Sequence, residues 1–306
     1  MIELVAGPAS ARVDPSCGAR IADLTVDAIP ILVTGDSRRD DPLDWGLYPM
    51  VPFAGRLRHG ELPWRGETFH LPLRRPPHAI HGTVLDVEWQ VIEHSRSSCT
   101  LSTPLVSPWP FAGRVDHEIV LTAHGLDLRL TVRADVDMPV QIGWHPWFRK
   151  PSRHSLPFRS VHRRDEHGIA EPVATPVDQI PVDQIPVDRN PVDAMSWGDV
   201  DDCFTDASDG LDDLLMLEID GLVVELRSTC EHWVVFDRPT HATCVEPQSG
   251  PPNVLAVDPR VVSAGTSHHE TFSIAWRSAE PRTESERLSA RSTRVGSLDH
   301  REGRRP

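Results

Sequence analysis

Apolar residues alternate with polar ones through much of this chain, whereas helical spacing is scarcely visible. Strict alternation predicts strands, because neighbouring side chains of a strand point to opposite faces of its sheet. Six segments carry the pattern, with apolar positions at Leu85, Val87, Trp89 and Val91; Val115, Ile119 and Leu121; Leu126, Leu128, Leu130 and Val132; Leu222, Val224 and Leu226; Trp233 and Val235; and Phe272, Ile274 and Trp276. The pattern therefore predicts a protein made mostly of β-sheet.

Turn signals fall between these segments. His124-Gly125, Asp220-Gly221 and Asp237-Arg-Pro are residues of the kind that join antiparallel strands through tight turns. The 29 prolines and 19 glycines also suit a loop-rich β protein. We therefore predict an all-β fold, a large antiparallel β-sandwich, with a single domain covering residues 1–278.

Two segments depart from the pattern. Residues 173–192 repeat the unit Pro-Val-Asp-Gln-Ile, which is too short and too rich in proline for a repeat core, so we expect an extended surface loop. Residues 280–306 contain seven arginines, five acidic residues and almost no large apolar ones. A segment of that composition cannot bury enough surface to order itself, so residues 279–306 are expected to form a disordered tail.

Charge and cysteine content narrow the classes of partner. The formal net charge of −14 argues against a nucleic acid or an anionic membrane as partner, because either needs a basic face. Five widely spaced cysteines without a CxxC pair suggest neither a disulfide framework nor a zinc ribbon. The N-terminal segment lacks the pattern of a signal peptide, and no run of 18 apolar residues occurs. We expect a cytoplasmic protein that binds a small molecule.

Candidate chemistry gathers in residues 141–150, where one imidazole, two indoles and a phenyl ring follow one another. Pro146 restricts His145 to extended geometry and cannot donate to a sheet ladder, so a strand is expected to end there. Glu246 precedes Pro247 in the same manner. A lone histidine or glutamate usually has a structural or surface role, but together these two offer an acid and a base at neutral pH.

The irregular stretch of residues 42–83 offers further binding groups, and long ordered loops in β proteins are usually functional. Arg56 follows Gly55, which permits close approach of a ligand to the backbone, and its guanidinium has five donors. His78 and His81 flank a short apolar pair that suggests a strand end. With Glu246 they raise the alternative of a metal-dependent β-barrel enzyme, but no compact cluster of three or four ligands is evident. We expect no metal and no cofactor.

Four short motifs carry a resemblance to a known family. They are Pro52-Phe-Ala-Gly-Arg-Leu, His78-Ala-Ile-His-Gly, Gly143-Trp-His-Pro-Trp-Phe and Val245-Glu-Pro-Gln-Ser-Gly-Pro-Pro-Asn, with Asp201-Asp-Cys-Phe between the third and the fourth. In this order they resemble the aldose 1-epimerases, or galactose mutarotases, from about Gly46 to Trp276. The resemblance implies a large β-sandwich that acts on a sugar.

The resemblance also implies a role for each matching residue. Glu246 would be the general base and His145 the general acid, while Arg56, His81 and Asp201 would hold sugar oxygens. The chain departs from the usual motifs in three places. Gly55 stands where asparagine is usual, Thr83 follows His81-Gly82 where a second glycine is frequent, and Asp202 replaces a histidine. These changes leave open which sugar is bound, and whether Asp201 or Asp202 binds it.

The chemistry itself needs two positioned groups. One removes the proton from the C1 hydroxyl, the other protonates the ring oxygen, and reclosure after rotation about the C1–C2 bond gives the other anomer. We expect Glu246 and His145 to face one another across a cleft as wide as a sugar, without a hydrogen bond between them. A catalytically silent carbohydrate-binding relative is the alternative, because such a protein needs the aromatic side chains and Arg56 but not the acid/base pair.

Overall fold

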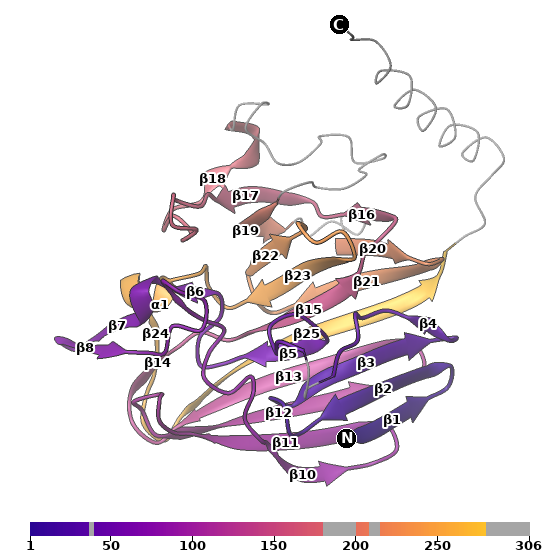
Figure 1. Ribbon diagram of the computed structural model, residues 1–306, viewed down its shortest axis with the longest axis horizontal. Helices are drawn as coiled ribbons and strands as arrows, with labels where there is room; N and C mark the ends of the chain where they lie inside the picture. Colours follow the sequence, from indigo (N-terminus) through magenta and orange to yellow (C-terminus); the bar gives the residue numbers. More distant parts are fainter. Residues whose placement is uncertain (37–39, 180–199, 208–214, 280–306) are drawn as a thin grey trace, which may run out of the picture.

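The computed structural model describes residues 1–36, 40–179, 200–207 and 215–279. Within these ranges two large antiparallel sheets and three two-stranded sheets make up nearly all of the regular structure (Figure 1). The predicted all-β antiparallel sandwich is confirmed. The predicted tail after residue 279 and residues 180–192 of the predicted proline-rich loop lie outside the described residues, and the single domain stays a prediction.

The larger sheet has eleven strands, drawn from the start, the middle and the end of the chain. They are β1 (Ile2–Ala6), β2 (Ala9–Asp14), β3 (Arg20–Val26), β4 (Ile29–Pro30), β5 (Leu47–Met50), β15 (Gly143–Arg149), β17 (Phe158–His162), β18 (Thr175–Pro176), β19 (Asp201–Ala207), β22 (His232–Phe236) and β23 (Ala242–Gln248). The order across the sheet is β1-β2-β3-β5-β15-β23-β22-β19-β17-β18, and β4 pairs with β3. β15 and β23 therefore lie side by side at its centre.

The second sheet has eight strands and a more local topology. They are β10 (Gln90–His94), β11 (Ser98–Leu105), β12 (Gly113–Leu121), β13 (Gly125–Ala134), β16 (Arg153–Ser155), β20 (Leu215–Ile219), β21 (Leu222–Ser228) and β25 (Ser267–Ser278). Their order is β10-β11-β12-β13-β25-β21-β20-β16. Four consecutive strands, β10 to β13, form a meander, and the predicted turn at His124-Gly125 joins β12 to β13.

Short elements complete the described fold. They are the strand pairs β6 (Arg56–Leu57) with β9 (Ala79–Ile80), β7 (Glu61–Trp64) with β8 (Glu67–His70), and β14 (Met138–Val140) with β24 (Arg260–Val262), the helix α1 (Val254–Val257), and the 3-10 turns η1 (Arg58–Gly60) and η2 (Val177–Gln179). Figure 1 shows β7, β8, β14, β24 and α1 together at one end of the large sheets. The first copy of the proline repeat enters β18 and η2, so at residues 175–179 the expected irregular loop is regular structure.

One cluster of buried apolar side chains extends from Leu4 to Trp276 and draws on both large sheets. In β12 and β13 the alternation is as predicted: one face is buried in this core, and the residues between, such as Glu118 and Arg129, are exposed. The predicted strands over residues 222–226, 233–235 and 272–276 are also found, as β21, β22 and β25.

The alternating segment Leu85–Val91 is an incorrect prediction for most of its length. The structure has turns there, and β10 begins only at Gln90. Leu85 and Trp89 are buried, whereas Val87 is exposed. The Trp89 backbone N–H donates to the Pro15 carbonyl at 2.7 Å, so these apolar side chains anchor a loop to the core. Leu85 and Trp89 are buried four residues apart in a loop, and this spacing also fits the period of two that is expected of a strand.

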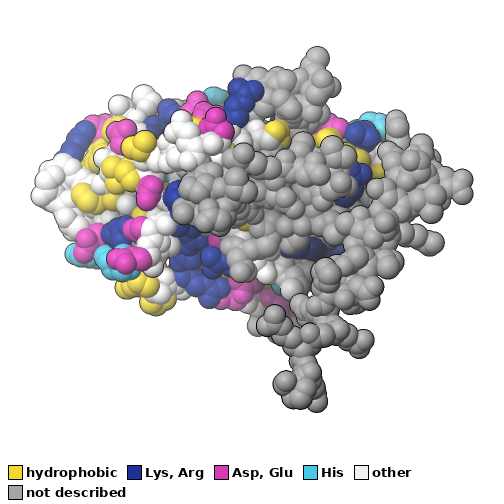
Figure 2. Space-filling view, turned by 90° about the horizontal axis from the view of Figure 1, so that it is seen from above, with side chains coloured by type: hydrophobic (Ala, Val, Ile, Leu, Met, Phe, Trp, Pro, Cys, Tyr) yellow, Lys and Arg dark blue, Asp and Glu magenta, His cyan; other side chains and the backbone are white. Residues whose placement is uncertain are grey.

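Among the described residues, no helix combines the length and the apolar character that crossing a bilayer requires. On the described part of the surface seen in Figure 2, basic and acidic side chains are interspersed, with a group of basic ones near its middle.

Candidate active site

His145 and Glu246 lie inside the two central strands of the larger sheet, which corrects the expectation that they lie at strand ends. The ladder between β15 and β23 pairs Gly143 with Gln248 and Trp147 with Cys244, and it skips the positions between them. Pro146 and Pro247 fall in this gap. Proline cannot donate a ladder hydrogen bond, but here it interrupts the ladder without ending the strand, because hydrogen bonds on both sides of the gap hold the strands together.

The same register places His145 opposite Glu246. Their Nε2 and Oε1 atoms are 3.1 Å apart, and both side chains are buried, at 6% and 3% exposure. The expected separation by a sugar's width is therefore wrong. Side chains directly opposite on adjacent strands start from Cβ atoms only about 5 Å apart, so an imidazole and a carboxylate on one face of the sheet meet directly.

Burial on this face favours the uncharged forms of both groups. Loss of water raises the pKa of Glu246 well above its ordinary value, and nearby Asp201 raises it further, against a hydrogen bond from Gln248. Loss of water also lowers the pKa of His145 to about 3, with a contribution from the positive charge of Arg20. The pair therefore favours a neutral form in which one proton lies between Oε1 and Nε2.

Aromatic neighbours fix the His145 ring in its plane. Tyr48 stacks on one side with ring centroids 4.9 Å apart, and Trp147 stacks at 5.4 Å. Tyr48 in turn has the guanidinium of fully buried Arg20 over its ring, 4.7 Å from the centroid. His81 meets His145 edge-on at 4.9 Å. The acid/base pair thus has little rotational freedom.

A cavity of about 200 Å³ lies over this pair. The six residues proposed from the sequence all line it: Arg56, His81, His145, Asp201, Asp202 and Glu246. Trp147 and Gln248, from the third and fourth motifs, also line it, together with residues that the sequence did not indicate, among them Asp44, Arg75, Arg164 and Phe236. The structure therefore brings the four motifs together around a single space of a size suited to a small molecule.

The charged side chains of the cavity are mostly paired. Arg164 forms an ion pair with the Asp201 carboxylate, and Arg75 lies 3.1 Å from Asp44. Arg56 makes no ion pair within the described ranges, and its guanidinium borders the cavity. Gly55 precedes it with a φ of +65°, where a Cβ would approach the Pro252 ring to 2.8 Å. The absence of a side chain at Gly55 lets the chain turn Arg56 into the site.

The register of β19 distinguishes the two adjacent aspartates. Asp201 pairs with Phe236, which lines the cavity, whereas Asp202 pairs with Val235, which lies in the core. Asp201 therefore shares the cavity face of the sheet, whereas the side chain of Asp202 belongs to the opposite face although the residue borders the cavity. Burial raises the pKa of Asp202, with the nearby charge of Arg164 opposing that effect.

Within the described part of the chain, three buried polar atoms of cavity residues lack a hydrogen-bond partner. They are Nδ1 of His81, Nδ1 of His145 and Oε1 of Gln248. His81 follows β9 with a φ of +57°, and its pKa is lowered well below the usual range by burial and by His145. Buried polar groups normally have partners, so these three atoms are unusual and mark the cavity wall as polar.

Of the three residues of the metal alternative, His81 and Glu246 line the cavity and His78 does not. His78 is hydrogen-bonded to the backbone of His59 and His167, away from Glu246. The ligand atoms of His145, Cys244 and Glu246 do lie within 4.8 Å of one another, a donor set that zinc accepts. Burial raises the pKa of the Cys244 thiol well above its ordinary value, which favours its protonated form. The expectation of a metal-free site stays a prediction.

Two of the groups that order this site, Arg20 and Tyr48, lie outside the four sequence motifs. Arg20 belongs to none of the motifs, and its burial depends on carbonyls of Trp45 and Pro42 that accept its hydrogen bonds. Tyr48 lies in the irregular stretch before Pro49, and it is the only tyrosine in the chain. That rarity was the one available hint.

Comparison with known proteins adds a family to this geometry. The family model for aldose 1-epimerase matches residues 9–273. The uncharacterized protein YihR of Escherichia coli K12 is 25% identical over 292 residues, which is 89% of this chain and 92% of YihR. The uncharacterized protein YphB of the same bacterium is 31% identical over 126 residues, which is 40% of this chain and 43% of YphB.

Solved structures show the same fold. The GalM/aldose epimerase homologue from C. elegans matches with a TM-score of 0.77 at 13% identity, over 91% of this chain and 99% of that one. Galactose 1-epimerase from Lactobacillus acidophilus NCFM matches with a TM-score of 0.72 at 13% identity, over 90% of this chain and 92% of that one. At such identities the likeness is one of fold.

Proposed function

The chain belongs to the aldose 1-epimerase family, and we propose that it interconverts the α and β anomers of an aldose by acid/base opening of the sugar ring. One observation carries the proposal: an imidazole nitrogen and a carboxylate oxygen lie 3.1 Å apart in the buried wall of a cavity of about 200 Å³. Such a pair can give and take protons at once, and the cavity can hold the molecule that exchanges them.

The short separation suits the reaction better than a wide one. The two oxygens that exchange protons, the C1 hydroxyl and the ring oxygen, are bonded to the same carbon and therefore lie within a hydrogen-bond length of each other. A donor and an acceptor 3.1 Å apart can address both. Glu246 as carboxylate takes the hydroxyl proton while His145 as imidazolium gives its Nε2 proton to the ring oxygen.

This transfer converts a charged pair into a neutral one. Ring opening starts from carboxylate and imidazolium, which the neutral resting pair forms when its shared proton moves from Glu246 Oε1 to His145 Nε2. It ends with carboxylic acid and imidazole beside the sugar as an open aldehyde. Burial favours the neutral pair, as the raised pKa of Glu246 and the lowered pKa of His145 show. Rotation about the C1–C2 bond and reversal of both transfers then close the other anomer and restore the charged pair.

The remaining cavity groups bind and orient the sugar. Arg56, His81 and Gln248 present free donors or acceptors to hydroxyls, and Asp201 adds a carboxylate. Trp147 and Phe236 give the cavity an apolar side for the C–H face of the ring. Each proton transfer supplies roughly 10²- to 10⁴-fold, and fixed orientation supplies more.

Polarimetry on freshly dissolved α-glucose and α-galactose, with NMR exchange between anomers for a wider panel of aldoses, tests the proposal. Glu246→Gln keeps the shape of the side chain and removes the base, so kcat is expected to fall by on the order of 10² or more. Calorimetry is expected to show that the variant still binds the sugar.

A matched control comes from a second pair in the same protein. His268 Nε2 and Glu270 Oε1 are also 3.1 Å apart and lie outside the cavity lining. Glu270→Gln alters a pair of the same chemistry, and it is expected to leave kcat unchanged. Anomer exchange at the parent rate by Glu246→Gln, with sugar bound, would refute the acid/base pair and leave the silent sugar-binding relative as the function.

A further inference from the structure

One wall of the cavity is a loop to which neither the sequence nor the comparisons assign a role. It is the pocket-wall loop, residues 163–170, between β17 and β18. Arg164, Gly168 and Ala170 of this loop line the cavity. Arg164 also forms the ion pair with Asp201 described above. The position of this loop therefore sets the position of a charged pair at the site.

The pocket-wall loop is organised around Asp165. Its Oδ1 accepts hydrogen bonds from the backbone N–H groups of His167 and Ile169, both at 2.9 Å. Gly168 has a φ of +75°, and a Cβ there would come within 2.6 Å of the Arg164 guanidinium. Instead, Arg164 Nε donates to the Gly168 carbonyl at 3.2 Å. The loop thus has a fixed internal shape that includes the Arg164 side chain.

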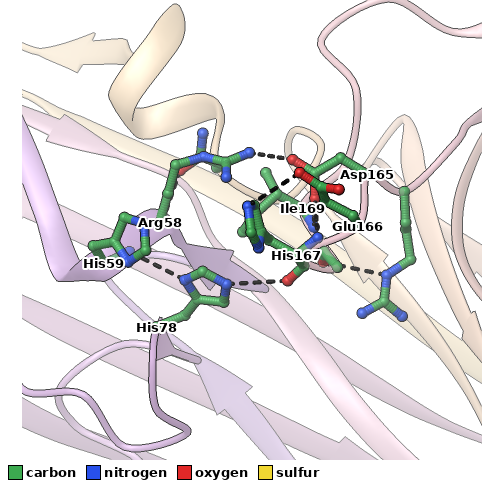
Figure 3. Close-up of polar contacts among 10 residues, drawn as sticks. Arg58, His59, His78, Asp165, Glu166, His167 and Ile169 are labelled. Carbon is green, nitrogen blue, oxygen red and sulfur yellow. Dashed lines mark hydrogen bonds and ion pairs between the residues drawn. The ribbon is translucent and has the colours of Figure 1, made fainter.

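Two contacts from a distant part of the chain hold this loop in place, as Figure 3 shows. The guanidinium of Arg58 forms an ion pair with Oδ2 of Asp165. Nε2 of His78 lies 3.0 Å from the carbonyl of His167. We call these two contacts the loop clamp. They leave the internal hydrogen bonds of the loop untouched, because they use the other carboxylate oxygen and an outward carbonyl.

The neighbours of His78 decide which of its nitrogens carries the proton. Nδ1 accepts a hydrogen bond from the backbone N–H of His59 at 3.1 Å, so it carries no hydrogen of its own. The hydrogen is therefore on Nε2, which donates to the His167 carbonyl. Burial lowers the pKa of His78, which keeps the ring in this neutral form at neutral pH.

We propose that Arg58 and His78 are positioning residues: they clamp the pocket-wall loop so that Arg164 and Asp201 are held where the sugar binds. The proposal rests on the proposed function. Neither residue lines the cavity, so the clamp acts through the loop and not on the reacting atoms. Its loss is expected to weaken sugar binding, seen as a higher KM and Kd, and to leave kcat nearly unchanged.

Two substitutions of one residue separate the loop contact from the rest of His78. His78→Gln keeps an N–H near the position of Nε2, so it retains the donor to the His167 carbonyl. His78→Asn keeps an acceptor near the position of Nδ1 for the His59 N–H, but it is too short to reach His167. We expect His78→Asn to raise KM and Kd roughly three- to tenfold, as for the loss of one hydrogen bond, and His78→Gln to stay within about twofold.

Asp165→Asn tests the other half of the clamp. Its amide oxygen can still accept from the two loop N–H groups, whereas its NH₂ faces the Arg58 guanidinium and breaks the ion pair. We expect a rise in KM similar to that of His78→Asn, and a larger rise when the two are combined. Glu166→Gln is the matched control: it alters an exposed carboxylate 3.5 Å from His167 Nε2, where solvent screens the attraction, and it is expected to match the parent.

Hydrogen exchange keeps the test independent of catalysis. In the protein without sugar, His78→Asn and Asp165→Asn are expected to speed exchange of the peptide that covers residues 163–170, and His78→Gln and Glu166→Gln are not. Unchanged exchange would overturn the clamp whether or not the protein is an epimerase. Equal KM changes in His78→Gln and His78→Asn, or a fall in kcat at constant KM, would overturn its action on sugar binding.

Discussion

The meander of the eight-stranded sheet and the centre of the eleven-stranded sheet use their two faces differently. In β12 and β13 one face packs into the core, and the other carries exposed charged side chains such as Glu118 and Arg129. In β15 and β23 nearly every residue is buried, on both faces. The first arrangement provides stability, and the second also provides a face from which water is excluded.

That second face is the one that holds the acid/base pair. On β15 the side chains of Trp144 and Phe148 enter the core, while His145 and Trp147 point to the cavity. Exclusion of water there shifts the pKa values of His145 and Glu246 toward their neutral forms. On the exposed face of β13 the Arg129 guanidinium is half exposed and 4.0 Å from Glu118, where solvent screens the attraction. Burial on both faces therefore gives the His145–Glu246 pair an environment without water, which the proposed proton transfer uses.

The largest expected effect is on the stability of the eight-stranded sheet, whose strands β12 and β13 have one face in the core and the other in solvent. Leu130 of β13 is fully buried in the common core, and Leu130→Ala is expected to lower the free energy of unfolding by about 2–5 kcal/mol, measured by urea titration. The folded variant is expected to keep the parent kcat, because Leu130 is remote from the cavity lining.

Its neighbour provides the control for that experiment. Arg129→Ala, one residue away on the exposed face, is expected to change stability by less than about 0.5 kcal/mol. Equal losses in the two variants would contradict the division of this sheet into a core face and a solvent face.

The two faces of β15 are expected to separate stability from catalysis. Trp144 donates from Nε1 to His117 Nε2 at 3.2 Å inside the core, so Trp144→Phe leaves a buried acceptor without its donor and should cost about 1–3 kcal/mol of stability. His145→Asn, on the cavity face, is expected to lower kcat by on the order of 10² at a smaller cost in stability. A variant of Trp144 that folds fully but loses kcat would show that the faces are not independent.

Strands with one face in the core and one in water could be predicted from the sequence, because their apolar and polar residues alternate. Val115 to Leu121 and Leu126 to Val132 were found as β12 and β13. The central strands β15 and β23 could not be found in this way, because burial of both faces removes the alternation. Their residues were noticed instead for chemistry, through His145 and Glu246 beside prolines.

The site was predicted in its membership but not in its geometry. Six residues named from the sequence line one cavity. The prediction that strands end at Pro146 and Pro247 was wrong, however, and it left out the strand pairing that places His145 opposite Glu246. Register depends on pairing between distant segments, and so does the ion pair of Arg164 with Asp201. Neither the register nor the ion pair can be predicted from the local sequence pattern. The burial of Arg20 behind Tyr48 could not be predicted from it either.

A further expected effect, of roughly 1 kcal/mol for each pH unit, is a dependence of stability on pH that differs between the two sheets. Burial lowers the pKa of His117, in the eight-stranded sheet, to about 3, whereas an unfolded histidine titrates near 6.5. Below about pH 6.5 the unfolded chain takes up a proton that the folded protein does not. Stability therefore falls as pH falls, by roughly 1 kcal/mol per pH unit from this group, until the folded pKa is reached.

His145 has a similarly low pKa, about 3, but the pKa of its partner Glu246 is shifted in the opposite direction. The raised pKa of Glu246 means that the folded protein takes up a proton before the unfolded chain does, which adds stability as pH falls toward the ordinary glutamate value. The two contributions offset one another in the central pair, whereas burial dominates the pKa of His117 and is opposed by a hydrogen bond to the Ala19 backbone. His117→Gln, which keeps an acceptor for Trp144, is therefore expected to flatten the decline of urea midpoints between pH 6.5 and 4.5.

Glu246→Gln is expected to steepen this decline, because the contribution of His145 is then no longer offset. Identical slopes in the parent and both variants would show that these buried groups are not what couples folding to pH.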